Sequence, residues 1–265
     1  MMPLMTRWRA QGCSFDWFHK KEIEMANQIV IELPIFAKDV FRLLALRTIV
    51  NQTNLIQRLD ECFDFTGGID TTERLSWDHD PFAYEHKQHE VPDKPLVKMT
   101  ERELCSSGRA FFRKEPFKGI GKVIDYEIPL DNEKDSAYGK VDLLSRSEDG
   151  KNAFVLEVKK FGSGEHPLRA LFEIFTFWKM LTKDGSHKLF IEKYKNGSET
   201  ISTCERVIPG LLLDVNSDIF KNLMNPSDQY VRSLRDKFFD PKIGMRVFSY
   251  DSELNVKEEK VEIKN

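Results

Sequence analysis

Cysteines are few in this sequence, and none is placed as paired metal or disulfide ligands would be. The four are scattered and form no Cys-x-x-Cys pair: Cys13, Cys62, Cys105 and Cys204. This spacing argues against a zinc ribbon and favours reduced thiols in a cytoplasmic protein.

Long apolar runs are missing as well. No run approaches the roughly 18 apolar residues that a membrane-spanning helix needs. The N-terminal stretch MMPLMTRWRAQGCSF also lacks the apolar segment of a signal peptide. Internal repeats and low-complexity segments are absent too. We therefore expect no membrane partner and a cytoplasmic, globular chain.

An excess of positive charge is the third absence. The formal net charge is −3, with 31% charged and 40% hydrophobic residues, which are ordinary globular values. A nucleic-acid partner would therefore have to be held by a local basic patch. No P-loop, helicase motif, zinc module or helix-turn-helix is recognisable to direct the chain to a nucleic-acid sequence.

The N-terminal third has a helical pattern followed by a polar stretch. Apolar residues recur at three-and-four spacing over 39–60, which predicts one long amphipathic helix, while 14–38 fits a helix or a helix plus a strand. Residues 64–95 are rich in turn formers, acids and histidines, but the histidine spacing matches no zinc-ligand pattern. We interpret 1–92 as a mainly helical segment plus a polar linker.

The next segment is expected to be a helix with a basic continuation. A helix beginning near residue 94 or 100 would place Glu101 on the inward-facing stripe with Val97 and Leu104. Between Lys98 and Lys122 there are seven Lys or Arg against three acids. This run is either a solvated face or a phosphate-facing surface.

The central feature is the stretch 139–160, which reads as two strands joined at Asp149-Gly150. A turn at this dipeptide pairs the strands so that Asp142 and Glu157 face each other, with Cβ atoms about 4.5–5.5 Å apart. Lys159 is two residues beyond Glu157 and so lies on the same strand face. Two opposed acids repel unless a cation lies between them, and this pattern predicts a divalent-metal site.

Further elements surround this hairpin. A strand is expected over 123–130, with Pro129 marking its end or a sheet edge. A strongly apolar helix is expected over 166–182, in which Arg169 either reaches a phosphate or pairs with Glu173. The remaining expectations are a strand over 187–194, a buried strand over 207–215, a helical region over 217–238 and an edge strand over 245–250.

The order helix, three strands, helix, strand resembles the PD-(D/E)XK nuclease superfamily, which includes restriction endonucleases and Holliday-junction resolvases. The matching residues are Gly139-Lys-Val-Asp142 and Leu156-Glu157-Val-Lys159, and Glu101 resembles the helix glutamate of the resolvases. Val141 stands where the family's proline would be. The resemblance covers roughly 93–195, under half of the chain.

The resemblance implies an α/β fold with a mixed sheet (α+β). It implies a restriction-endonuclease-like αβββαβ core over 93–250, an N-terminal helical extension over 1–92 and a charged tail over 251–265. The implied activity is metal-dependent hydrolysis of phosphodiester bonds, in DNA rather than RNA, with Mg²⁺ or Mn²⁺ as cofactor.

The resemblance also implies roles for single residues. Asp142, Glu157, Glu101 and the Val158 carbonyl would hold the metal, with Glu127 on the preceding strand competing with Glu101, and Lys159 would orient the attacking water. The residues expected to contact nucleic acid are Arg109, Arg113, Lys114, Lys160 and Arg169.

Two alternatives to a nuclease stay open: a catalytically inactive nucleic-acid-binding protein, or a protein-interaction protein, on the same fold. Apart from nucleic acid, the partner to expect is a second copy of the chain in a homodimer.

Overall fold

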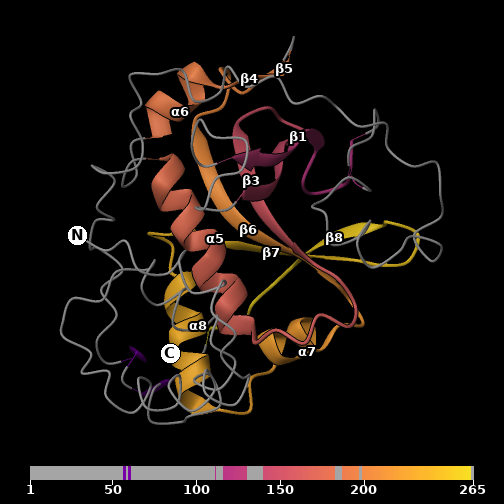
Figure 1. Cartoon of the computed structure of the whole chain (residues 1–265), viewed down its shortest axis with the longest axis vertical. Coiled ribbons are helices and arrows are strands. Elements are labelled where there is room, and N and C mark those ends of the chain that lie inside the picture. Colours follow the sequence, from indigo (N-terminus) through magenta and orange to yellow (C-terminus); the bar gives the residue numbers. More distant parts are fainter. Residues whose placement is uncertain are drawn as a thin grey trace, which may run out of the picture.

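The fold is known from a computed structural model that describes residues 56–57, 59–60, 111, 116–129, 140–182, 187–196 and 199–263. Within these residues the centre is a six-stranded sheet in the order β1-β2-β3-β6-β7-β8 (Figure 1). The strands are β1 (Lys122–Pro129), β2 (Lys140–Arg146), β3 (Asn152–Lys159), β6 (Arg206–Asp214), β7 (Arg246–Tyr250) and β8 (Val256–Glu259).

The sheet is mixed. The pairs β1–β2, β2–β3 and β7–β8 are antiparallel, whereas β3–β6 and β6–β7 are parallel. Strand β6 lies inside the sheet and is buried over most of its length, from Val207 to Leu213, as expected for a parallel strand covered on both faces. The predicted α/β class with a mixed sheet is confirmed.

Helix α5 (Pro167–Leu181) crosses one face of this sheet (Figure 1). It contacts β3 and β6 and packs against α7 (Asp218–Met224) and α8 (Gln229–Phe238). Its apolar residues surround most of the helix, so nearly all of its side chains are buried. His166 caps the helix and Pro167 fills its first turn, where a missing N–H costs nothing. The predicted helix over 166–182 is confirmed.

A smaller unit lies between α5 and β6 along the chain. It comprises α6 (His187–Lys193) and a two-stranded ribbon of β4 (Lys195–Asn196) and β5 (Glu199–Thr200). The predicted strand over 187–194 is wrong, because this segment is α6. Its buried apolar residues Phe190, Ile191 and Tyr194 follow helical spacing, and the exposed Lys188 and Glu192 pair one turn apart at 3.8 Å.

The C-terminal part also differs from expectation in its details. The predicted helical region over 217–238 is two helices, because Asp228 caps a new helix by accepting hydrogen bonds from the Tyr230 and Val231 N–H groups. Strand β7 is not the edge strand expected over 245–250, since β8 pairs along its outer side. Strand β8 lies within the segment assigned from the sequence to the charged tail.

Candidate metal centre

The hairpin of β2 and β3 adopts the predicted register. Leu143 pairs with Leu156 and Leu144 with Val155, so the next positions along the two strands are Asp142 and Glu157. The Asp142 carboxylate accepts a hydrogen bond from the Val158 N–H at 2.8 Å, which ties the start of β2 to the end of β3.

The turn itself is longer than the two-residue loop inferred from Asp149-Gly150. The Ser147 N–H donates to the Asn152 carbonyl at 2.9 Å, and the Gly150 N–H donates to the Ser147 carbonyl at 2.9 Å. Gly150 takes φ +71°, as its residue type allows, whereas Asp149 is not in the positive-φ region. One extra residue on each side leaves the centre of the hairpin unchanged, so the register of the acids is preserved.

Lys159 lies at the centre of an ion-pair cluster. Its Nζ is 2.7 Å from Glu157 Oε1, 2.8 Å from Glu165 Oε2 and 3.0 Å from Glu173 Oε2. Glu165 comes from the loop after β3 and Glu173 from α5, and only the contact with Glu173 has full hydrogen-bond geometry. The lysine therefore links the hairpin to the helix that covers it.

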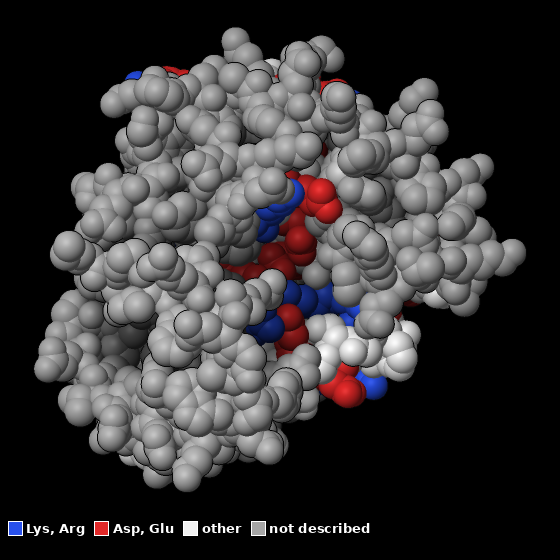
Figure 2. Space-filling model, in the orientation of Figure 1, with Lys and Arg blue, Asp and Glu red and all other residues white. Residues whose placement is uncertain are grey.

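Negative charge predominates in this cluster. Asp142, Glu157, Glu165 and Glu173 face one ammonium from Lys159 and one guanidinium from Arg169, whose Nη1 is 2.8 Å from Glu165 Oε1. Acidic and basic side chains also adjoin each other on the described part of the face shown in Figure 2. Four carboxylates against two cations leave a deficit of two positive charges, the charge of one divalent cation.

Burial makes the deficit costly. Burial raises the pKa of the Asp142 carboxyl to about 7, against the opposing charge of Lys159. Burial and then the neighbouring Asp142 and Glu173 charges hold the pKa of the Glu157 carboxyl well above its usual value. Burial alone would lower the pKa of the Lys159 ammonium, but Glu157, Glu173 and Glu165 outweigh it and hold that pKa well above its usual value.

Two carboxylate oxygens in the cluster, Glu157 Oε2 and Glu165 Oε2, are buried without a hydrogen-bond partner among the described residues. Glu165 Oε2 lies 2.8 Å from Lys159 Nζ, and the Glu157 side chain as a whole is only 5% exposed. A buried acceptor without a partner is costly unless a cation or water satisfies it. Together with the charge deficit, Glu157 Oε2 fits a hard divalent cation such as Mg²⁺ or Mn²⁺.

The set of ligands is incomplete in the part of the chain that the structure describes. There, no three His, Cys, Asp or Glu side chains gather into a group ready to hold a metal. Asp142 and Glu157 would have to be completed by the Val158 carbonyl, by water or by an acid elsewhere. Glu101 lies outside the described residues.

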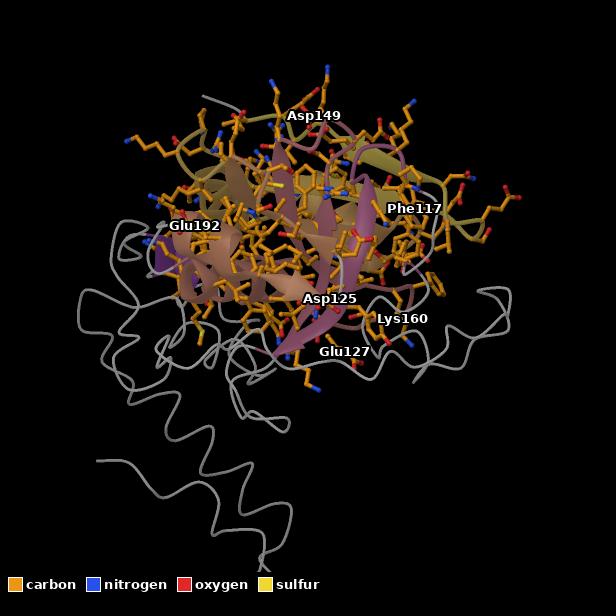
Figure 3. All side chains as sticks on the ribbon, turned by 90° about the horizontal axis from the view of Figure 1, so that it is seen from above. Phe117, Asp125, Glu127, Asp149, Lys160 and Glu192 are labelled. Atoms are coloured by element: carbon orange, nitrogen blue, oxygen red, sulfur yellow. The ribbon has the colours of Figure 1, made fainter. Side chains whose placement is uncertain are left out.

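Glu127 holds an unusual backbone conformation on β1. Its neighbours Tyr126 and Ile128 pair with Leu143 and Val141, which places Glu127 opposite Asp142 along the strand. Its φ is +52°, in the left-handed region that residues with a side chain seldom adopt. Figure 3 shows Glu127 and Lys160 at one end of the sheet, away from Asp149. Glu127 therefore lies at the correct end of the hairpin but outside any three-acid group among the described residues.

The nucleic-acid contacts predicted from the sequence lie mostly outside the described residues, as Arg109, Arg113 and Lys114 do. Arg169 lies within the described residues and pairs with Glu165. The alternative pairing of Arg169 with Glu173 is therefore wrong, and Glu173 contacts Lys159 instead. Lys160 follows Lys159 directly and is partly buried.

Glu165 and Glu173 are the residues of this cluster whose role the sequence did not reveal. The available signal was the polar stripe of α5, since an acid on a helix buried on almost every side needs a cation on the sheet below. The sequence does not show that this cation is Lys159 rather than Arg169, because that depends on how α5 lies across β3.

Comparisons with models of known protein families, with curated proteins and with solved structures find no match to this chain. None of the helices in the described ranges is long and apolar enough to cross a membrane.

Proposed function

We propose that this chain is a metal-dependent nuclease of the PD-(D/E)XK type, which hydrolyses phosphodiester bonds in DNA. The observation that carries the proposal is the hairpin. Its register brings Asp142 and Glu157 to adjacent positions with Lys159 beside them, and the buried Glu157 Oε2 has no hydrogen-bond partner in the part of the chain that the structure describes.

The residues present fit a divalent cation, which Asp142, Glu157 and the Val158 carbonyl would hold, with Glu101 or Glu127 completing the set. When bound, Mg²⁺ or Mn²⁺ polarises the scissile phosphate and lowers the pKa of a bound water. The cation also lowers the cost of keeping Asp142 and Glu157 ionised side by side.

Lys159 has a separate task. Its ammonium is held by Glu165 and Glu173 as well as by Glu157, so its position does not depend on Glu157 alone. A fixed positive charge beside the reacting phosphate orients the attacking water and offsets the negative charge that develops on the phosphate oxygens. The high pKa of Lys159 keeps it charged and makes it unsuited to act as a base.

The test is a Mg²⁺-dependent cleavage assay on single-stranded, duplex and branched DNA and on RNA. We expect cleavage that EDTA stops and that Asp142→Asn and Glu157→Gln each reduce at least about a hundredfold. Both substitutions preserve side-chain shape and remove a charge. The matched control is Glu148→Gln, in the exposed turn at the far end of the hairpin, which should leave the rate unchanged. Cleavage that persists in Glu157→Gln at the wild-type rate would contradict the proposal.

A second candidate is a chain of the same fold that binds nucleic acid or a protein without cleaving. The observation that favours it is the engagement of Lys159 by three glutamates, which compete with a substrate phosphate for the ammonium. Nucleic-acid binding without metal-dependent cleavage of any of these substrates would establish the binding alternative. Absence of both would leave the protein-interaction alternative.

A further inference from the structure

An aromatic side chain stands exposed directly after the candidate metal centre. Phe161 is 65% exposed, more than any other large hydrophobic side chain in the described residues. The others that are exposed are Ile263, at 43%, and Val215, at 36%. Full burial of a phenyl ring is worth roughly 1.5–3 kcal/mol, and at Phe161 most of this free energy is still available to a ligand that covers the ring.

The backbone around Phe161 is built as a tight turn. The Ser163 N–H donates to the Lys160 carbonyl at 3.3 Å, which makes Phe161 and Gly162 the two central residues. Gly162 has φ +78°, as the third residue of a type II turn requires. A Cβ added at Gly162 or Gly164 would meet no atom within 4 Å, so the space beside the turn is open. The turn presents the ring at its tip instead of folding it onto the sheet.

The turn is adjacent to the proposed reaction centre. Phe161 is two residues beyond Lys159, so their Cα atoms are at most about 7 Å apart. Glu165, which contacts Lys159 at 2.8 Å, closes the same loop. Phe161 is therefore close in the chain to the residues proposed to hold the scissile phosphate.

We infer that Phe161 is a stacking platform for an unpaired base of the substrate, an inference that rests on the proposed nuclease function. The substrate at this site is then a single strand, or the single-stranded part of a branched molecule, because bases inside a duplex offer no free face. Stacking is tolerant of base identity, since every base has a π-face.

Charge supports stacking over further phosphate contacts. The proposed divalent cation would offset the surplus carboxylates only where it binds, and the nearby Lys159 and Arg169 are already paired with glutamates. Stacking adds affinity without a charge, so it needs no further cation beside the site. The contribution of Phe161 should then be nearly independent of salt, unlike a phosphate contact.

The experiment measures binding by fluorescence anisotropy with labelled oligothymidylate, oligouridylate and a mixed-sequence duplex. The full chain carries Glu157→Gln to prevent cleavage, and Phe161 is replaced by Ala, Leu or Trp. We expect Phe161→Ala and Phe161→Leu to weaken single-strand binding by about tenfold, Phe161→Trp to preserve it, and the duplex to be unaffected. The tenfold ratio should hold between about 50 and 200 mM salt, while every absolute affinity falls.

The matched control is Ile263→Ala, which removes an exposed apolar side chain beyond the far end of β8 and should change no affinity. Equal single-strand binding by wild-type Phe161 and Phe161→Ala would overturn the inference and leave the nuclease proposal standing. An equal loss of affinity for the duplex would also overturn the inference. A loss of self-association in Phe161→Ala would overturn it too, because it would identify a second copy of the chain as the partner of Phe161. If the Glu157→Gln chain binds none of the nucleic acids and the wild-type chain with Mg²⁺ also neither binds nor cleaves any of them, both proposals fail together.

Discussion

Lys159 determines the charge balance of the candidate centre. Replacing it with Met would leave Glu157, Glu165 and Glu173 without their shared cation, and Glu157 is only 5% exposed. Removing one partner of a buried ion pair costs about 3–5 kcal/mol. We expect Lys159→Met to lower the free energy of unfolding by about this amount, measured by urea denaturation at neutral pH.

The control for Lys159 is a double-mutant cycle with Glu173→Gln. Glu173→Gln alone should cost less than Lys159→Met, because Lys159 keeps Glu157 and Glu165. The double variant should be more stable than Lys159→Met, since one uncompensated carboxylate is gone. Additive effects of the two substitutions would show that the Lys159–Glu173 contact contributes nothing to stability.

Glu127 is a strained residue, and its strain can be measured. A residue with a side chain at φ +52° costs of order 1–3 kcal/mol, which glycine avoids. We expect Glu127→Gly to raise the free energy of unfolding by about 1 kcal/mol, while Glu127→Ala, which keeps the strain, gives no gain. Equal effects of the two variants would trace the change to the side chain and not to the backbone.

Helix α5 depends on a titratable cap. His166 Nδ1 accepts the Leu168 N–H at 3.2 Å, which requires the imidazole to be neutral. Burial lowers the pKa of His166 from 6.5 to about 4, with the Asp228 charge opposing. Because the folded pKa lies below the unfolded one, the unfolded chain takes up the proton first. The contribution to stability is therefore complete above about pH 6.5 and is lost as the pH falls towards 4.

The measurement is the free energy of unfolding against pH for the wild type and for His166→Asn, which can still cap but does not titrate. Relative to His166→Asn, the wild type should lose about 1–2 kcal/mol of its free energy of unfolding between pH 6.5 and 4. This value allows for solvent screening at a partly exposed side chain. Parallel curves for the two proteins would show that His166 does not control this loss.

The sequence predicted elements well where the pattern was local. The register of β2 and β3 was predictable because a turn centred on Asp149-Gly150 sets it for any symmetric loop length. The segment 187–194 was not, because a short apolar run bounded by turn formers suits a strand or a helix alike. Tertiary packing decided it: Tyr194 at the end of α6 donates to the buried Asp125 carboxylate on β1 at 2.8 Å, a contact 69 residues apart in sequence.

The arrangement of the whole sheet lies beyond local patterns. The parallel pairing of β3 with β6 joins segments separated by α5, α6 and the β4–β5 ribbon. Gly210 permits this close approach, since a Cβ there would lie 2.9 Å from Leu156 Cδ2 and 3.1 Å from the Arg246 carbonyl oxygen. The candidate centre was thus predictable as an acid pair with a lysine, but Glu173 joins it only through the packing of α5 on the assembled sheet.

The candidate centre draws side chains from β2, β3, the following loop and α5, so a cation bound there stabilises the folded chain as a unit. A ligand that binds only the folded state adds about 2.7 kcal/mol at a hundred times its dissociation constant. We expect Mn²⁺ to raise the unfolding midpoint, with circular dichroism and tryptophan fluorescence shifting together because the unit unfolds cooperatively. Glu157→Gln should abolish the shift and Glu148→Gln should keep it. An equal Mn²⁺ shift in Glu157→Gln would show that the cation binds elsewhere on the chain. The absence of a shift in the wild type would contradict the proposed metal cofactor, and this result requires no knowledge of the substrate.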